Sequence, residues 1–484
     1  MSATKIIKVE PVSRIEGHAE IKLFLDESGS LADAQVKVVE VRGFEKFLIG
    51  RPIEEMPLLT PRMCGICHVP HHLCSAKAVD ATFGLNPEEI PLTAYKLRRL
   101  MMYGSYIHSH VLHFFYLAAP DLVLGPDSNP AKRNVIGLLE ANPELVKQVI
   151  AARKVGQEIT KILGGRSVHP VTAVPGGQSH PLSLADRDKI ERNVKDLAQN
   201  FLPMAKDLAL SLFDQYGEVI DSLGVISTKH MGMVGTNGNL EFYDGKVRLI
   251  DENADTLEEY YGIEYRNVIS ERIKDFSYLK FPYYKKRSFE DGCYRVGPLG
   301  RINVADRIDT PIAQELLSEF RNKFGRPAQQ TLLYHYARII EFAHAIETVL
   351  DLLADPEITG SLLRTPVKPR EGEGVGIVEA HRGTLFHHYQ TDNKGIVRDV
   401  NLIVATVGNN EAINRSVQAA ARNLIKDNTP AEGLMNRLEM CVRAYDPCFS
   451  CATHNVRSGA VATRVKILDH EDKLIHVMQN WDER

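Results

Sequence analysis

The chain has 484 residues, of which 25% are charged and 44% are hydrophobic, and its formal net charge is −4. These values are ordinary for a globular protein, and the lack of a basic excess argues against a nucleic-acid partner and against attachment to an anionic membrane. The sequence shows neither an apolar run long enough to span a bilayer nor the organisation of a secretory signal, so we expect a cytoplasmic protein with no membrane span.

The N-terminal part of the chain has the alternating pattern of β-strands, and a helical pattern follows it. Residues 19–25 and 34–41 alternate between apolar and polar side chains on either side of a polar turn, which predicts a hairpin. From about residue 70 to 117, apolar side chains recur at helical spacing on most sides. A helix that is apolar on most of its surface is buried, so this stretch is expected at the centre of a helical bundle.

The rest of the chain is predicted to add long helices and one more hairpin. Residues 131–163, 184–216 and 329–353 have helical patterns, and residues 218–310 are typical of loops with short strands.

The C-terminal third begins with a second predicted hairpin. Residues 384–389 and 397–404 can pair across a polar turn, and two helices are expected near 411–426 and 430–443. No repeat or linker divides the chain. We therefore expect the α+β class, mainly α, with a large central helical bundle and small peripheral β-sheets.

Four of the seven cysteines form two Cys-x-x-Cys pairs, Cys64 with Cys67 and Cys448 with Cys451. Seven cysteines are too few for a disulfide scaffold in a chain of this length. A Cys-x-x-Cys turn lets two sulfurs converge on one ion, and two such turns provide four thiolates for a soft or borderline metal. The spacing alone leaves open a closed structural zinc site and a redox-active disulfide.

The positions and flanks of the two pairs favour a functional metal site over a structural zinc. The pairs lie near opposite ends of the chain, whereas the ligands of structural zinc are usually local in sequence. A histidine follows each pair, and these are His71 and His454. Ionisable side chains that a closed structural site does not need flank the pairs, and these are Arg62, Arg443 and Asp446.

The two cysteine segments resemble the two signatures of the large subunits of nickel–iron hydrogenases. They read Arg-x-Cys-Gly-x-Cys-x-x-x-His and Asp-Pro-Cys-x-x-Cys-x-x-His. Residues 14–18, 42–45, 380–383 and 443–446 also fall in the order of the family, so the resemblance covers essentially the whole chain. Within the family, the sequence is most similar to the cytoplasmic, methyl-viologen-reducing type, which does not reduce deazaflavin and is associated with heterodisulfide reductase and methanogenesis.

The resemblance implies that all four cysteines bind nickel. Cys67 and Cys451 would bridge the nickel to an iron that carries carbon monoxide and cyanide, and soft thiolates suit both metals. The reaction would be the reversible, heterolytic cleavage of H2, with the proton taken by a terminal thiolate such as that of Cys448 or by a nearby base.

Five further residues would have roles carried over from the family. Glu16 would be the first proton relay, Arg382 would lie above the iron and hydrogen-bond cyanide, and Thr406 would donate a hydroxyl hydrogen bond to cyanide. Glu45 and His454 would ligate a magnesium or iron ion. Without the resemblance, Glu16 would be interpreted as an ion-pairing or capping carboxylate, and Arg382 and Glu45 as surface charges.

The sequence departs from the family at two positions near this site. Ser109 stands where uptake hydrogenases have an aspartate, and His381 stands where many members have proline before Arg382. His381 is therefore a candidate hydrogen-bond donor. Asp446 keeps its position and could pair with Arg382, and His71 would hydrogen-bond close to the cysteines.

The C-terminal end of the chain has two interpretations. In the family, the precursor is cut after the last histidine of the second signature once nickel is loaded. Residues 455–484 would then be a removable extension, and residues 1–454 would be the hydrogenase domain. The alternative is a permanent strand, because residues 461–468 alternate between apolar and polar side chains.

Electron transfer requires a partner chain. The three remaining cysteines, Cys74, Cys293 and Cys441, cannot hold an iron–sulfur relay, and no glycine-rich nucleotide-binding motif follows a strand. We therefore expect an iron–sulfur small subunit beside the metal site. The resemblance implies that electrons continue through an electron-transfer subunit to heterodisulfide reductase or ferredoxin.

Two other functions fit parts of the pattern. The related quinone-site subunit of respiratory complex I has lost the cysteines, so the retention of all four here argues against that function. A non-catalytic, zinc-stabilised structural protein is the third hypothesis, and the metal content of the protein distinguishes the three.

Overall fold

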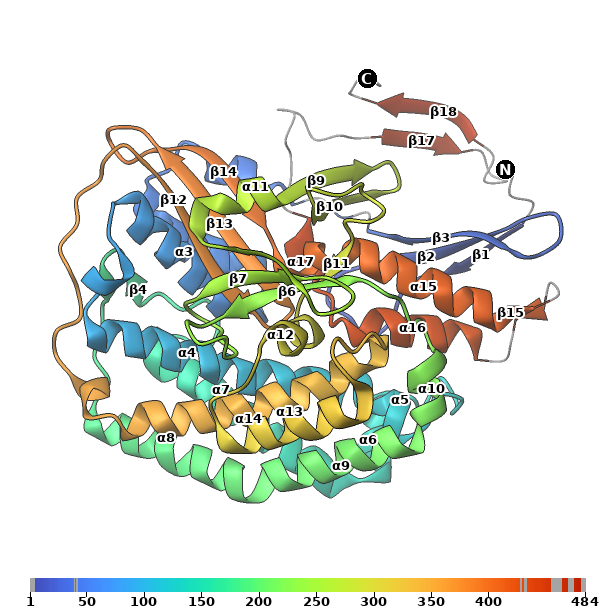
Figure 1. Ribbon diagram of the computed structural model, residues 1–484, viewed down its shortest axis with the longest axis horizontal. Helices are drawn as coiled ribbons and strands as arrows, with labels where there is room; N and C mark the ends of the chain where they lie inside the picture. The colour runs from blue at the N-terminus through green and yellow to red at the C-terminus, as the bar shows by residue number, and fades with distance from the viewer. Residues whose placement is uncertain are drawn as a thin grey trace.

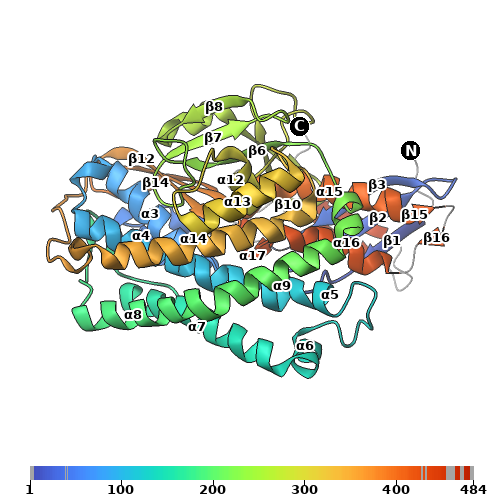
Figure 2. The same cartoon turned by 60° about the horizontal axis from the view of Figure 1, so that its bottom comes forward.

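The computed structural model shows a helical body with small sheets along one side (Figure 1, Figure 2). It describes residues 5–38, 40, 42–426, 429–430, 433–453, 464–468 and 474–479. This arrangement confirms the predicted mainly α member of the α+β class. No helix in the described ranges has both the length and the apolar character needed to cross a membrane.

The helical segments of the described residues are α1 (Phe44–Leu48), η1 (Ile53–Glu55), α2 (Met56–Leu59), η2 (Thr60–Met63), α3 (His68–Thr82), η3 (Pro87–Glu89), α4 (Leu92–Val111), η4 (Leu112–Ala118), α5 (Ala119–Val123), α6 (Val135–Ala141), α7 (Pro143–Gly164), α8 (Leu184–Asp196), η5 (Leu197–Phe201), α9 (Leu202–Gln215), α10 (Gly217–Ser222), η6 (Gly262–Glu264), α11 (Tyr265–Val268), α12 (Pro298–Val304), α13 (Pro311–Phe324), η7 (Thr331–Leu333), α14 (Tyr334–Ala354), η8 (Pro356–Thr359), η9 (Ala405–Asn409), α15 (Asn410–Leu424), α16 (Leu434–Ala444) and α17 (Phe449–Ala452). The strands are β1 (Lys5–Val9), β2 (Glu20–Leu25), β3 (Leu31–Lys37), β4 (Ala173–Val174), β5 (Gly177–Gln178), β6 (Lys229–Val234), β7 (Lys246–Ile250), β8 (Thr256–Tyr260), β9 (Ile269–Lys274), β10 (Ser277–Tyr284), β11 (Tyr294–Arg295), β12 (Gly372–Ala380), β13 (Gly383–Thr391), β14 (Val397–Ile403), β15 (Ile425–Lys426), β16 (Thr429–Pro430), β17 (Arg464–Leu468) and β18 (Leu474–Gln479).

Helix α4 is the centre of the bundle and packs against α7 and α14. Every residue from Leu100 to Val111 is buried, which confirms the buried helix that the sequence predicts. The predicted stretch is nevertheless divided, because Pro87 and Pro91 lie between the end of α3 and the start of α4, and proline cannot continue a helix from the preceding turn.

The other predicted helices are present with local changes. The segment 131–163 forms α6 and α7, which meet at Asn142. The side chain of Asn142 accepts the N–H of Leu145 at 3.0 Å, and Pro143 begins α7, so the boundary has the usual polar cap followed by proline. The segment 184–216 continues from α8 through the π-helical turn η5 into α9.

Both predicted hairpins are confirmed. Strands β2 and β3 pair antiparallel, and β1 adds a third strand that the prediction did not include. Strands β13 and β14 also pair antiparallel, and β12 completes their sheet in the order β12-β13-β14. The segment 218–310 contains the predicted short strands, several of them in the four-stranded sheet β11-β6-β7-β8.

The turn between β12 and β13 carries two of the predicted site residues. Ala380 lies opposite Gly383, so His381 and Arg382 are the two residues of a tight turn. Strand β12 packs on α3, the helix that follows the first cysteine pair. The hairpin therefore brings Arg382 to the start of α3.

The described part of the C-terminal end is a pair of strands. β17 and β18 pair antiparallel, so a strand does occur within the segment 461–468. The proposed cut after residue 454 lies outside the described residues, and the removal of residues 455–484 stays a prediction.

His72 is buried in α3 and should make stability depend on pH. Its Nδ1 lies 2.6 Å from the carbonyl oxygen of Pro57, and its Nε2 accepts the N–H of Ala173 at 2.9 Å. Burial lowers the pKa of His72 to about 4. The folded protein binds the neutral form of the ring. Its contribution to the free energy of unfolding is therefore complete above the unfolded pKa of about 6.5 and is lost as the pH falls towards 4.

We therefore expect the free energy of unfolding to decrease as the pH is lowered from about 6.5 to about 4. In His72→Gln, the slope of the free energy of unfolding against pH should be smaller by about 1.4 kcal/mol per pH unit. Urea titrations between these pH limits measure the slope. The matched control is His180→Gln, at an exposed histidine, which should leave the slope unchanged. An unaltered slope in His72→Gln would contradict the assignment.

Candidate metal centre

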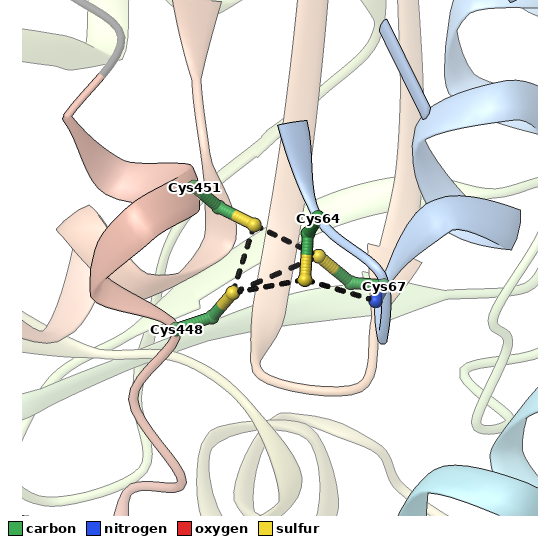
Figure 3. A group of neighbouring side chains, drawn as sticks. All are labelled: Cys64, Cys67, Cys448 and Cys451. Carbon is green, nitrogen blue, oxygen red and sulfur yellow. Dashed lines mark hydrogen bonds between the residues drawn. The ribbon is translucent and has the colours of Figure 1, made fainter. Parts of the chain in front are cut away.

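Four cysteine sulfurs from opposite ends of the chain meet in one buried cluster, as the sequence predicts (Figure 3). Cys64 follows η2, and Cys67 is the residue before the first turn of α3. Cys448 is the residue before α17, and Cys451 lies within α17. The four Sγ atoms all lie within 4.8 Å of one another, so they can share one ion.

None of the four clustered cysteines forms a disulfide in the structure. Cys64 Sγ lies 3.3 Å from Cys448 Sγ, and Cys67 Sγ lies 3.1 Å from Cys451 Sγ. The shortest separation, between Cys448 Sγ and Cys451 Sγ, is 2.8 Å, whereas a disulfide bond is about 2.05 Å long. The four sulfurs gather as one group rather than as a single pair, which favours a metal site over a redox disulfide.

The local electrostatics favour a thiolate at one of the four positions. Cys64 Sγ accepts the backbone N–H groups of Ile66 at 3.2 Å and Cys67 at 3.4 Å. Hydrogen bonding from Cys448, and to a lesser extent from the other two sulfurs, lowers the pKa of Cys64 well below its ordinary value. Burial raises the pKa of Cys448 and Cys451, so their protons must leave when a cation binds.

Arg382 is buried beside the cluster rather than on the surface. Its Nε donates to the backbone oxygen of Asp446 at 2.6 Å, and its Nη2 donates to Asp446 Oδ1 at 3.0 Å. Burial opposes its charge, but Asp446 and the cysteine sulfurs raise the pKa of Arg382 above its ordinary value. Its Nη1 has no hydrogen-bond partner among the described residues. An unpaired buried donor is costly, so Nη1 is available to an acceptor at the cluster.

A glycine allows the turn that carries Arg382 to approach α12. Gly297 has a φ of +85°, and a Cβ there would lie 2.8 Å from the carbonyl oxygen of Arg382. Only glycine satisfies both the left-handed backbone and the close contact.

Thr406 lies in η9 and contacts the second cysteine pair. Its Oγ1 accepts the backbone N–H of Cys448 at 3.0 Å. The hydroxyl therefore positions the cysteine and keeps its own proton for an acceptor.

Glu16 lies directly beside the second cysteine pair. Residues Glu16 and Cys448 form an isolated parallel bridge, and Glu16 Oε2 accepts the N–H of Ser450 at 3.2 Å. The close approach of this segment to α17 requires glycine at position 17, because a Cβ there would lie 2.8 Å from the backbone nitrogen of Ser450. The ion pair of Arg14 is with Asp121, so the alternative of a Glu16–Arg14 pair is not supported.

Glu45 is buried, at 5% exposure, rather than a surface charge. Its Oε1 accepts the N–H of Leu402 at 2.8 Å and lies 3.1 Å from Lys280 Nζ. Lys280 Nζ also lies 3.1 Å from Asn401 Oδ1. The second predicted ligand of this ion, His454, lies outside the described residues.

The other predicted neighbours of the site are buried polar side chains. His71 Nδ1 lies 3.0 Å from His387 Nε2. His381 Nε2 lies 3.0 Å from Ser105 Oγ. Ser109 Oγ is buried and has no hydrogen-bond partner within the described ranges. His381 therefore bonds to α4, and its bond is not directed at a cysteine.

Sequence reasoning missed two residues that hold the backbone before Asp446. Arg338 is fully buried in α14 and donates from Nη1 to the carbonyl oxygen of Ala444 at 2.8 Å. His113 Nε2 lies 2.7 Å from the carbonyl oxygen of Arg443 and 3.9 Å from Asp446 Oδ1. The available signal was a charged side chain among the apolar residues at the start of α14, which also carries Glu341, Glu347 and Asp351, since a charged residue is almost never fully buried unless it is paired.

Comparison with known proteins assigns this arrangement to a family. The sequence profile of nickel-dependent hydrogenases matches residues 42–131 and 234–454, and a HoxL-like profile matches residues 6–41. The chain belongs to the nickel-dependent hydrogenase family. It is 44% identical over 475 residues to a chain of the F420-non-reducing hydrogenase of Methanothermobacter marburgensis, and the match covers 97% of this chain and 99% of the relative.

Two further comparisons extend the hydrogenase assignment. The chain is 42% identical over 480 residues to the beta chain of the NAD-reducing hydrogenase HoxS of Cupriavidus necator, covering 96% of this chain and 98% of the relative. The crystal structure of an NAD+-reducing [NiFe]-hydrogenase in the H2-reduced state matches with a TM-score of 0.90 and 40% identity, covering 94% of this chain and 100% of that one. This hydrogenase chain is therefore the catalytic large subunit of an oxidoreductase, and its four cysteines fit a nickel–iron centre.

Proposed function

We propose that this hydrogenase chain catalyses the reversible, heterolytic cleavage of H2 at a nickel–iron centre. The observation that carries the proposal is the convergence of four cysteine sulfurs beside a buried guanidinium whose Nη1 has no partner among the described residues. Thiolates suit soft and borderline metals, and the unused donor suits a small anionic ligand of the metal.

The residues present fit this centre. Cys67 and Cys451, whose sulfurs lie 3.1 Å apart, would hold both nickel and iron, and Cys64 and Cys448 would hold nickel. Arg382 and the hydroxyl of Thr406 would hydrogen-bond cyanide on the iron. When bound, the metal pair supplies the position at which H2 is polarised and split.

The protein's own side chains would carry the proton to solvent. Cys448 would hold it first and Glu16 next, and the backbone β-bridge between the two residues places them side by side. Beyond Glu16, Ser450 Oγ lies 3.4 Å from Glu40 Oε2, and Glu40 Oε1 lies 2.5 Å from His18 Nδ1. The side chain of His18 is 76% exposed, so this series of groups ends at the surface.

A magnesium or iron ion is assigned to Glu45 and His454, with residues 455–484 removed to complete the mature chain. Carboxylate, amide and carbonyl oxygens suit a hard cation. The buried carboxylate of Glu45 is one such ligand and supports the assignment, and in the structure Lys280 Nζ provides its counter-charge at 3.1 Å.

Electrons would leave through an iron–sulfur small subunit, from which they would continue to heterodisulfide reductase or ferredoxin in the cytoplasm. The similarity to an F420-non-reducing hydrogenase supports this route. The similarity to NAD-reducing relatives favours a second candidate acceptor, NAD+ reduced by a further partner chain. Co-purification from native extract, followed by assays with ferredoxin, heterodisulfide and NAD+, separates the two routes.

The metal content of the purified, mature chain tests the proposed chemistry. We expect one nickel and one iron per chain from the cysteine cluster, with either one magnesium or a second iron from the Glu45 site, together with infrared bands of metal-bound carbon monoxide and cyanide. Zinc alone would instead support a structural protein, and a metal-free folded chain would support a scaffold like that of the complex I relative.

A further inference from the structure

A second, fully buried arginine forms hydrogen bonds with the turn that carries Arg382. Arg301 lies in α12 at 0% exposure. Its Nη1 donates to the carbonyl oxygen of Ala380 at 2.8 Å, and its Nη2 donates to that of His381 at 3.0 Å. Ala380 ends β12 and His381 is the first residue of the turn, so Arg301 binds the two peptide groups immediately before Arg382.

The donor groups of Arg301 are fully used. Its Nε and Nη2 donate to the two carboxylate oxygens of Glu341 at 2.6 and 2.8 Å. Its Nη1 also donates to Glu379 Oε2 at 2.8 Å. With the two backbone carbonyls, these make five hydrogen bonds for the five N–H groups that a guanidinium has.

The same turn is held at the carbonyls on either side. Tyr106 donates its hydroxyl to the carbonyl oxygen of Glu379 at 2.9 Å. Asn409 Nδ2 lies 3.3 Å from the carbonyl oxygen of Arg382. Four consecutive carbonyls, at residues 379–382, therefore accept hydrogen bonds from side chains of α4, α12 and η9.

The acceptors of Arg301 are themselves fixed. Glu341 Oε2 also lies 2.8 Å from His110 Nε2, and Glu379 Oε1 accepts the hydroxyl of Thr384 at 2.7 Å. The guanidinium lies 5.4 Å from the ring centre of Tyr106, which adds a cation–π contact. Neither the arginine nor its partners can turn without breaking a buried hydrogen bond.

Arg301 and Arg382 differ in one respect that suggests a division of roles. Arg301 uses every donor on the protein, whereas Arg382 keeps Nη1 without a partner among the described residues. A donor that acts on a bound ligand is effective only when its position is fixed in advance. The observed contacts provide such fixing at the peptide groups next to Arg382.

We propose that Arg301 is a positioning residue that fixes the β12–β13 turn and so aims the free donor of Arg382 at the metal centre. This inference rests on the proposed role of Arg382 in binding a ligand of the iron. Arg301 does not touch the reacting atoms. Its effect passes through the carbonyls of Ala380 and His381.

The first test measures the turn itself in the full-length chain, without regard to metal. Lysine has three donors on a single nitrogen and cannot reproduce the five bonds of Arg301. In Arg301→Lys, amide hydrogen exchange across residues 380–383 should accelerate at least about tenfold, which corresponds to about 1.4 kcal/mol of lost protection. The matched control is Arg295→Lys, because Arg295 is also fully buried but donates to Thr228, Gln329 and Ile226 instead of the turn. It should leave exchange at 380–383 unchanged.

The second test measures the metal-loaded enzyme by infrared spectroscopy and kinetics. Arg301→Lys should shift the cyanide bands and lower kcat about 10- to 100-fold with little change in KM, because the donor would be misplaced while access of H2 is unaffected. Arg295→Lys should keep the wild-type bands. If Arg301→Lys does not fold, Glu341→Gln is the substitute, since it keeps the side-chain volume but weakens the two-point contact with Arg301.

The outcomes separate this inference from the proposed function. Unchanged exchange at 380–383, or unmoved cyanide bands in a variant that carries them, would overturn the positioning role and leave the hydrogenase chemistry intact. Equal shifts of the cyanide bands in Arg295→Lys would also overturn the positioning role, since the loss of any buried arginine would then have the same effect. Absence of carbon monoxide and cyanide bands from the wild-type enzyme would instead refute the proposed centre.

Discussion

Replacing Cys451 with serine is expected to abolish both hydrogen oxidation and hydrogen evolution, and to leave residues 455–484 attached. Cys451 Sγ lies 3.1 Å from Cys67 Sγ and 2.8 Å from Cys448 Sγ, so it is a shared corner of the cluster. A hydroxyl oxygen is a poor replacement for a soft thiolate that must contact two metals. Viologen-linked activity, nickel content and intact mass of the purified variant measure the result.

Cys74→Ser is the matched control for this experiment. Cys74 is also fully buried, at 0% exposure, but it lies outside the cluster and donates to the carbonyl oxygen of Gly376 at 3.2 Å, a bond that a serine hydroxyl can make. We expect its nickel content and activity to match the wild type. Normal turnover in Cys451→Ser would rule out the four-cysteine centre, and an equal loss in Cys74→Ser would show that the fold, not the ligand, had failed.

The cysteine cluster could be predicted from the sequence because its signals are local. Each Cys-x-x-Cys turn sets two sulfurs at one helix end, and the residues around Cys64 and Cys448 carry the family signatures. The meeting of the two pairs followed from the need of a soft metal for several thiolates. No long-range packing had to be known.

The supports of the site could not be predicted, since their partners are distant in sequence. Arg301 binds Glu341 and Glu379, which lie 40 and 78 residues further along. Lys280 reaches Glu45 across 235 residues. A periodic pattern shows that a face is buried, but it does not tell which buried charges will meet.

The secondary structure could likewise be predicted where its signals are local in sequence, and not where they depend on distant residues. The apolar periodicity of α4 and the alternation of β2 were sufficient to predict these elements. The third strand β1 was not predicted, because its partner β2 supplies the hydrogen bonds that hold it. The division at Asn142 depends on a side-chain cap, which competes with a helical pattern that continues on both sides.

Glu16→Gln is expected to retain nickel and iron but to suppress hydrogen–deuterium exchange between H2 and heavy water by about 10²- to 10⁴-fold. Glutamine keeps the length of the side chain and an oxygen that can accept the N–H of Ser450, but it cannot take up and release a proton. The cleavage site would be intact while the next proton acceptor is missing. Isotope exchange followed by mass spectrometry measures the rate, and infrared bands recorded on the same sample show whether the metal centre is intact.

The matched control is Glu20→Gln, four residues further along in β2. Glu20 pairs with Lys22 at 3.0 Å and has a side-chain exposure of 13%, so it is a partly buried carboxylate of the same size away from the second cysteine pair. It should exchange at the wild-type rate. Wild-type exchange in Glu16→Gln would remove Glu16 from the proton route. Suppressed exchange with altered cyanide bands would mean that the substitution had disturbed the centre, because Glu16 is bridged to the backbone of Cys448 and a loss of that bridge would move a ligand of the nickel.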